Sequence, residues 1–138
     1  MKTALESFAG LIALTVWADG EYDELERQTA EDIAEAFDLN TSEFCSAVEK
    51  AVREIVPMNE TEANGYLEKA AAEIVEDERG PVFEAVLEMA LSDGILTEEE
   101  TNNILSISDA MGMDRAFAVM LLCDLIKTDP DIEILINE

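Results

Sequence analysis

Carboxylate side chains gather at two short turns of this chain, and the two turns share one pattern. The first turn reads Asp19-Gly20-Glu21-Tyr22-Asp23-Glu24-Leu25-Glu26, and the second reads Asp93-Gly94-Ile95-Leu96-Thr97-Glu98-Glu99-Glu100. Carboxylates, backbone carbonyls and water are the oxygen ligands that Ca²⁺ and Mg²⁺ accept. Each turn also follows an expected helix C-terminus, where carbonyl groups without helical partners lie beside Asp19 or Asp93. One interpretation is therefore a divalent-cation site at each turn.

The Asp-Gly spacing matches the second half of an EF-hand calcium loop, but the first half is missing. The earlier ligand positions would be Thr15 and Trp17 in one copy and Met89 and Leu91 in the other. Three of these four residues have no side-chain oxygen, and all four are expected to be helical. A complete EF-hand is excluded, and a looser oxygen site stays open.

The same turns also have a purely structural interpretation. Gly20 and Gly94 can close a helix C-terminus in the left-handed conformation. Asp23 and Thr97 are good N-cap residues, and a glutamate stands three positions after each, so two capping boxes are expected, with Glu26 and Glu100. The first turn of a helix favours acidic residues in any case, because of the helix dipole. The cation and capping interpretations both remain open.

The two turns belong to a longer internal repeat. The interval that relates Asp19 to Asp93 also relates Ile33 to Ile107 and Leu39 to Met113. Apolar residues recur at helical spacing through both copies, so the sequence predicts an all-α fold, a compact bundle of about seven helices with an internal pseudo-twofold repeat. We expect a single domain over residues 1–138, with repeat units at about 4–56 and 80–127 and a connecting helix at about 59–77.

The helix of each repeat that precedes its acidic turn is apolar on almost every side, so both are expected at the centre of the core. The tail at residues 131–138 is either a docked extended segment or disordered. The third and fourth helices each have two candidate N-caps: Thr41 or Ser42, and Asn59 or Thr61.

The charge of the chain limits its partners. It carries 33 acidic and 8 basic residues, a net charge of -25, but its 49% hydrophobic content is that of a folded protein. Such a field repels phosphate backbones and anionic lipids, so we expect no nucleic-acid binding. Cations, or a protein partner with a basic or helical surface, are the partners that this charge favours. The same acidity also serves solubility alone.

The residue types exclude several kinds of catalytic site. The chain has no histidine and only two cysteines, so a structural zinc site, a Cys/His nucleophile pair and an imidazole base are not expected. Cys45, Cys123 and Met120 stand in apolar helical segments and are expected to be buried. Carboxylates are so numerous that no acid–base pair stands out, and no phosphate-binding loop is present. We therefore expect no enzymatic activity.

The N-terminal apolar stretch superficially resembles a signal peptide. Its equivalent in the second repeat lies deep inside the chain, so we interpret both as core helices and expect a cytoplasmic protein. The longest purely apolar run, residues 116–123, is far shorter than the ~18–20 residues of a membrane span, and no membrane insertion is expected.

The pattern from Ala18 to Leu39, repeated from Ser92 to Met113, resembles the tellurite-resistance TerB family. The resemblance implies a helical bundle and a bacterial module of stress response or tellurite resistance. It also implies metal binding, which position by position would fall on Asp19, Asp23, Glu26, Asp93, Glu98 and Glu100, with Ca²⁺ or Mg²⁺ as the cofactor. Thr97 replaces the Asp23 carboxylate, so the two sites need not be equivalent. The alternative function is an acidic adaptor that docks a basic or helical protein and has no specific metal site.

Overall fold

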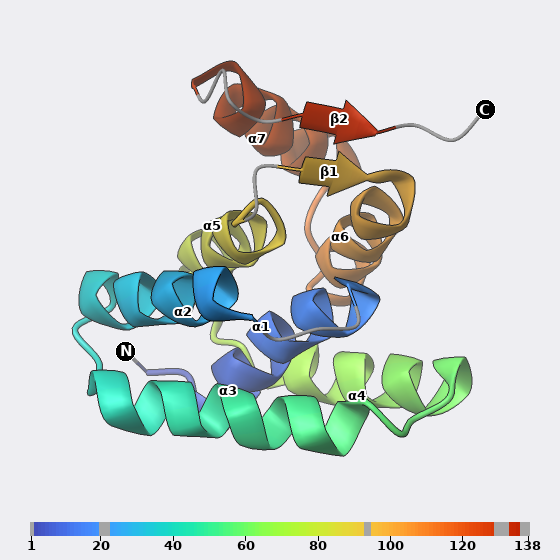
Figure 1. Ribbon diagram of the computed structural model, residues 1–138. Coiled ribbons are helices and arrows are strands. Elements are labelled where there is room, and N and C mark those ends of the chain that lie inside the picture. The colour runs from blue at the N-terminus through green and yellow to red at the C-terminus, as the bar shows by residue number, and fades with distance from the viewer. Residues whose placement is uncertain (1, 20–22, 93–94, 129–132, 136–138) are drawn as a thin grey trace.

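The computed structural model describes residues 2–19, 23–92, 95–128 and 133–135 (Figure 1). Within these residues the chain is an all-α bundle with one short pair of strands, so the predicted fold class is confirmed. The elements are α1 (Leu5–Asp19), α2 (Glu24–Ala36), α3 (Thr41–Ile55), α4 (Glu60–Ala72), the 3-10 turn η1 (Glu76–Glu78), α5 (Arg79–Ala90), β1 (Ile95–Thr97), α6 (Glu98–Ala110), α7 (Arg115–Thr128) and β2 (Glu133–Leu135).

Helix α1 lies at the centre of the bundle, as its all-round apolar sequence predicts. Every residue from Phe8 to Val16 is buried, and α1 contacts α3, α4, α5 and α6 (Figure 1). The ring of Phe8 packs 4.8 Å from that of Phe37 and 5.2 Å from that of Phe44, which joins the ends of α2 and α3 to the core. Helix α5, the equivalent of α1 in the second repeat, is also largely buried. Each acidic turn therefore follows a buried central helix in the chain.

Within the described residues, side-chain caps begin five of the helices. Asp23 caps α2 and Thr97 caps α6, as predicted, and α4 is capped by Asn59, one of its two candidate residues. Asp114 caps α7, because its Oδ1 accepts from the backbone N–H groups of Ala116 at 2.8 Å and Phe117 at 3.4 Å. The predicted cap of α3 is wrong, because Asn40 takes that position and its Oδ1 accepts from the backbone N–H of Glu43 at 3.0 Å. Asparagine is one of the strongest N-cap residues, and it begins the helix one residue earlier.

The connecting helix is shorter than predicted. Helix α4 ends at Ala72, well before residue 77, and the acidic run that follows forms the separate turn η1. The carboxylate of Glu78 in this turn accepts hydrogen bonds from the N–H groups of Lys2 and Thr3 and from Thr3 Oγ1. These bonds, led by that from the Thr3 hydroxyl, hold the pKa of Glu78 below its usual value. The N-terminal segment is thereby attached to η1.

Helices α2 and α6 end in the same way. After α2, Asp38 has a φ of 58°, and the N–H of Leu39 donates to the carbonyl of Ala34 at 2.8 Å. After α6, Gly112 has a φ of 72°, and the N–H of Met113 donates to the carbonyl of Ser108 at 3.0 Å. Both ends are Schellman motifs, which require a left-handed residue at this place.

The repeat is broken at its third helix. Helix α3 lies along α1, whereas its equivalent α7 mainly contacts α6 and stands away from α5 (Figure 1). The expected burial of α7 side chains is therefore wrong for two residues, since Met120 is 51% exposed and Cys123 is exposed. Cys45 is buried, and both thiols are free.

The tail adds a short extended segment. Strand β2 pairs in parallel with β1, with Leu96 opposite Ile134, so residues 133–135 are the docked alternative of the two that the sequence left open. No helix within the described residues is both long enough and apolar enough to cross a bilayer.

Candidate functional site

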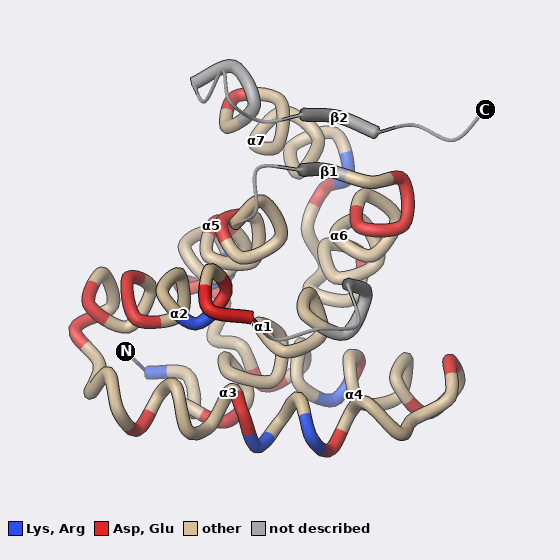
Figure 2. Tube along the Cα trace, in the orientation of Figure 1, with Lys and Arg blue, Asp and Glu red and all other residues tan. Residues whose placement is uncertain are grey.

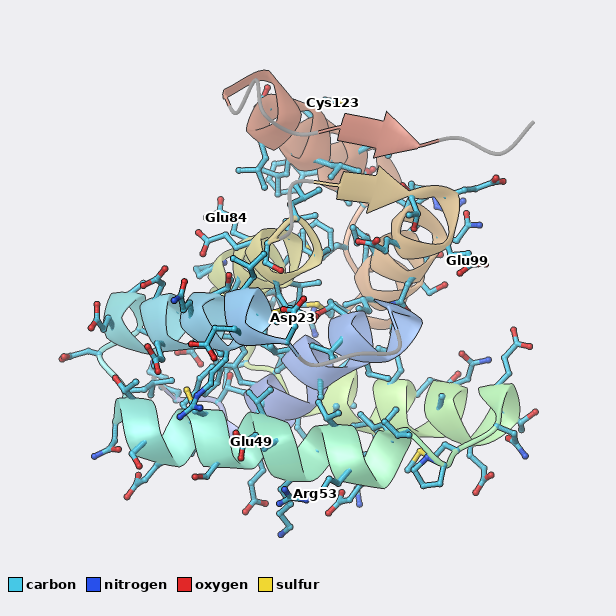
Figure 3. The ribbon with its side chains drawn as sticks, in the orientation of Figure 1. Asp23, Glu49, Arg53, Glu84, Glu99 and Cys123 are labelled. Atoms are coloured by element: carbon cyan, nitrogen blue, oxygen red, sulfur yellow. The ribbon has the colours of Figure 1, made fainter. Side chains whose placement is uncertain are left out.

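The first acidic turn connects the end of α1 to the start of α2. Asp23 is the N-cap of α2, and its Oδ1 accepts from the backbone N–H of Glu26 at 2.9 Å. The carboxylate of Glu26 returns the bond by accepting from the backbone N–H of Asp23 at 3.2 Å. This reciprocal capping box was predicted, and it holds the two carboxylates in a defined position (Figure 3 labels Asp23).

The second acidic turn has a related geometry. Thr97 Oγ1 accepts from the backbone N–H of Glu100 at 3.1 Å and lies 3.2 Å from the Glu100 carboxylate, to which its hydroxyl donates. Glu98 and Glu100 are the first and third residues of α6, and side chains two positions apart face different sides of a helix. Glu98 is exposed and Glu100 is buried. The cap therefore positions Glu100 rather than Glu98.

The burial of two glutamates distinguishes these turns from the other caps. Glu26 is 3% exposed and Glu100 is 6% exposed. The capping box of α4, formed by Asn59 and Glu62, has the same reciprocal bonds, but its glutamate is exposed. Capping alone thus does not require a buried carboxylate, and the burial is a property of the acidic turns.

Two predicted ligands fall outside this geometry. Asp19 is the last residue of α1, but its side chain, like the whole of Asp93, lies outside the described residues. Among the side chains that the structure does describe, no three acidic, cysteine or histidine residues converge in a way that would hold a metal ion. The structure brings together Asp23 with Glu26, and Thr97 with Glu100, and the predicted metal set as a whole stays a prediction.

A second acidic surface, which the sequence reasoning missed, follows the outer side of α5. Two cavities of about 420 and 320 Å³ share Glu84 and Glu88, and we call them together the α5 groove. The larger cavity lies against α2 and the smaller against α7; the other residues that line them are Ile33, Ala36, Phe37, Glu78, Pro81, Ala85, Leu87, Leu121, Asp124 and Leu125. The i, i+4 spacing of the two shared glutamates is the signal that could have found this surface.

Two effects raise the pKa of Glu88 in the α5 groove. Partial burial raises the pKa of Glu88, and the neighbouring carboxylates of Asp32 and Glu84 raise it further. Like charges are thus concentrated where the solvent is partly excluded. In Figure 3, Glu84 points outward from α5 on the side between α2 and α7, while Glu99 of the second acidic turn points away from the opposite side of the molecule.

The family of the chain follows from a comparison with protein-family models. The model described as "Tellurite resistance protein TerB" matches residues 5–122, which include α1 to α6, most of α7 and both acidic turns. The chain belongs to the TerB family. Comparison with curated proteins and with solved structures found no match. The TerB match agrees with the helical bundle and supports a module of the tellurite-resistance type.

Proposed function

We propose that this TerB-family chain is a non-catalytic, cytoplasmic stress-response module that binds a divalent cation, Ca²⁺ or Mg²⁺, through its two acidic turns. The ligands in this proposal are Asp19, Asp23 and Glu26 at the first turn, and Asp93, Glu98 and Glu100 at the second. The observation that carries it is the burial of Glu26 and Glu100 at equivalent positions of the two repeats.

The physical argument concerns the cost of burial. A carboxylate removed from water is destabilised unless charge or hydrogen bonds compensate it. Glu26 and Glu100 keep hydrogen bonds within their caps, but the exposed Glu62 shows that a capping glutamate can also remain in solvent, so capping alone does not account for the burial at the two acidic turns. A cation held beside the buried oxygens would lower that cost.

The surroundings of the first turn are also favourable to a cation. Helix α1 ends at Asp19, and the last carbonyl groups of a helix have no N–H partners within it. Together they carry a partial negative charge, to which the carboxylates of Asp23 and Glu26 would add. The oxygen chemistry is that of Ca²⁺ and Mg²⁺ sites, which combine carboxylates with carbonyls and water.

Calorimetric titration of the chelator-treated protein with CaCl2, MgCl2 and MnCl2, in 150 mM KCl, tests this function. We expect saturable binding that is lost in the double variant Glu26→Gln/Glu100→Gln and unchanged in Glu62→Gln, whose side chain has the same capping role but is exposed. A second double variant, Asp19→Asn/Asp93→Asn, leaves both caps in place and should also lose binding. Helical circular dichroism of each variant verifies the fold.

The controls decide between a site and general counter-ion uptake. Binding that persists in both double variants, or that falls equally in Glu62→Gln, would show that no specific cation site exists at the turns. The absence of any saturable heat with the unmodified protein would have the same meaning.

A second function, docking of a basic or helical protein partner, is supported by a different observation. The α5 groove carries several carboxylates over an apolar floor, and it shares no residue with the acidic turns. Loss of cation binding would leave this second proposal intact.

A further inference from the structure

We propose that the α5 groove is the docking site for a basic amphipathic helix of a partner protein. This inference rests on the second function above and adds the surface and the chemistry of the occupant. It is independent of the cation proposal.

The groove exists because the repeat is asymmetric. In the first repeat α3 covers α1, but in the second repeat α7 stands away from α5 and leaves the cavity of about 320 Å³ between them. Figure 1 shows α5 between α2 and α7, with its outer side facing the space between these two helices. The positions of α1 equivalent to Glu84 and Glu88 are Gly10 and Leu14, which are buried beside Tyr66 of α4 and Asn103 of α6, whereas the two glutamates of α5 are exposed.

Two apolar residues of α7 are exposed where a partner protein could cover them. Phe117 is 45% exposed and Met120 is 51% exposed, and they stand where α3 has the exposed polar residues Glu43 and Ser46. A helix that faced only water would be expected to keep polar residues at these positions. Phe117 is one turn before Leu121, which lines the groove, so the apolar surface of the groove continues along α7.

The charge of the groove selects the partner. Its lining residues in the described part of the chain are apolar or acidic, with Glu78, Glu84, Glu88 and Asp124 along the edges. The cavities beside Tyr66 differ, because Lys50 or Lys69 stands among their carboxylates. Figure 2 shows basic residues on α2, α3 and α4 and near the N-terminus, but none of the described basic residues lines the two cavities. A surface of one sign steers and retains a partner of the opposite sign.

The shape suits a helix of modest length. Helix α5 has 12 residues and is about 18 Å long, so a partner helix that lies along it would need about as many residues. Apolar side chains spaced i, i+3, i+4 and i+7 on one face would enter the two cavities, and lysine or arginine on the flanks would meet the carboxylates. A second copy of this chain, with its net charge of -25, fits such a surface poorly.

The test uses the full chain and a synthetic probe. The probe is a 14-residue, end-blocked peptide of leucine and lysine with leucine at the helical spacing above, labelled with fluorescein and followed by anisotropy. We expect one-to-one saturable binding, with no binding of the leucine/glutamate peptide of the same pattern and much weaker binding of a leucine/lysine peptide of scrambled order. Raised KCl should weaken the binding.

Matched variants locate the surface. An exposed ion pair changes a dissociation constant by a factor of roughly 1.4 to 5, so the loss of two such pairs in Glu84→Gln/Glu88→Gln should weaken peptide binding about 2- to 30-fold. Glu43→Gln/Glu54→Gln removes the same charge from the cavity beside Tyr66 and should leave binding unchanged. Phe117→Ser should weaken binding by about fivefold, since about half of this ring is available for burial. Val119, 40% exposed on the opposite side of α7, is its control as Val119→Ser.

Any other outcome contradicts the proposal that the α5 groove is the docking site. If the two double glutamate variants lose peptide affinity equally, the peptide is attracted to an acidic protein in general and not to the groove. If Phe117→Ser and Val119→Ser lose affinity equally, the peptide does not bind to the particular side of α7 that carries Phe117. Binding lost only in Glu43→Gln/Glu54→Gln would retain partner docking but place it beside Tyr66. The proposal of a docked basic helix is wrong if no peptide binds. It is also wrong if sedimentation shows a dimer in which a second copy of the chain covers α7.

Discussion

Two glycine-to-alanine substitutions should change the stability of this protein in opposite directions. Gly112, after α6, has a φ of 72°, whereas Gly65 lies inside α4 in open space. Alanine at position 112 must adopt the left-handed conformation, which is unfavourable for a residue with a Cβ atom. Alanine at position 65 replaces glycine in a helix interior, where alanine is the most favourable residue.

The structure sets the size of both effects. A Cβ atom at Gly112 would lie 3.6 Å from Arg79 Nη1, an ordinary contact, so only the backbone term of about 1–2 kcal/mol acts against alanine there. A Cβ atom at Gly65 meets nothing within 4 Å, so Gly65→Ala should gain the helix-propensity difference of about 0.8–1 kcal/mol. The matching change in the first repeat, Asp38→Gly, should stabilise by about 0.5 kcal/mol, since aspartate tolerates this conformation better than alanine.

Urea denaturation followed by circular dichroism measures these free energies, and for a domain of this size 1 kcal/mol corresponds to about 4 °C in Tm. Gly112→Ala should lower Tm by about 4–8 °C, and Gly65→Ala should raise it by about 3–4 °C. A Gly112→Ala variant as stable as the parent would refute the assignment of a left-handed C-cap at this position. Shifts of the same sign in both variants would refute the reasoning from backbone conformation altogether.

Two carboxylates should show opposite dependence of stability on pH. The pKa of Glu88 is raised, so its ionised form opposes folding; Glu88→Gln should raise Tm at pH 7, and the gain should vanish as the pH falls to the usual glutamate pKa of about 4.3. The pKa of Glu78 is lowered, so its contribution to stability is complete above the usual glutamate pKa and is lost as the pH falls through the lowered pKa. Urea denaturation between pH 7 and pH 3 should therefore show a smaller loss of unfolding free energy for Glu78→Gln than for the parent.

The helices and their caps could be predicted from the sequence because the signals are local. Asp23, Asn59 and Thr97 each precede an apolar pattern and have a glutamate three residues later, and all three cap their helices. The cap of α3 was misplaced because Asn40, Thr41 and Ser42 are consecutive good caps. Local preference cannot choose among them.

Burial at the sites could not be predicted in the same way. Glu26 and Glu62 each stand three residues after an N-cap and complete a capping box, but the first is buried and the second is exposed. The difference depends on which other elements pack against the helix start. For the same reason Met120 and Cys123 were expected to be buried: they stand in an apolar helical segment, but the angle at which α7 leaves α6 is a tertiary property.

The comparison between the two repeats separates two kinds of feature. A buried capping glutamate occurs in both copies, so it reflects something that both turns share, either a requirement of the fold or a common ligand. The α5 groove occurs in one copy only, so the fold does not require it: in the first copy the equivalent positions, Gly10 and Leu14, are buried. A chain that leaves this face open, places Phe117 on its border and tolerates the unfavourable charge of Glu88 gives up stability at one surface. Such a local loss is expected where a surface is completed by a partner, and a bound basic helix would remove both the apolar exposure and the repulsion between carboxylates.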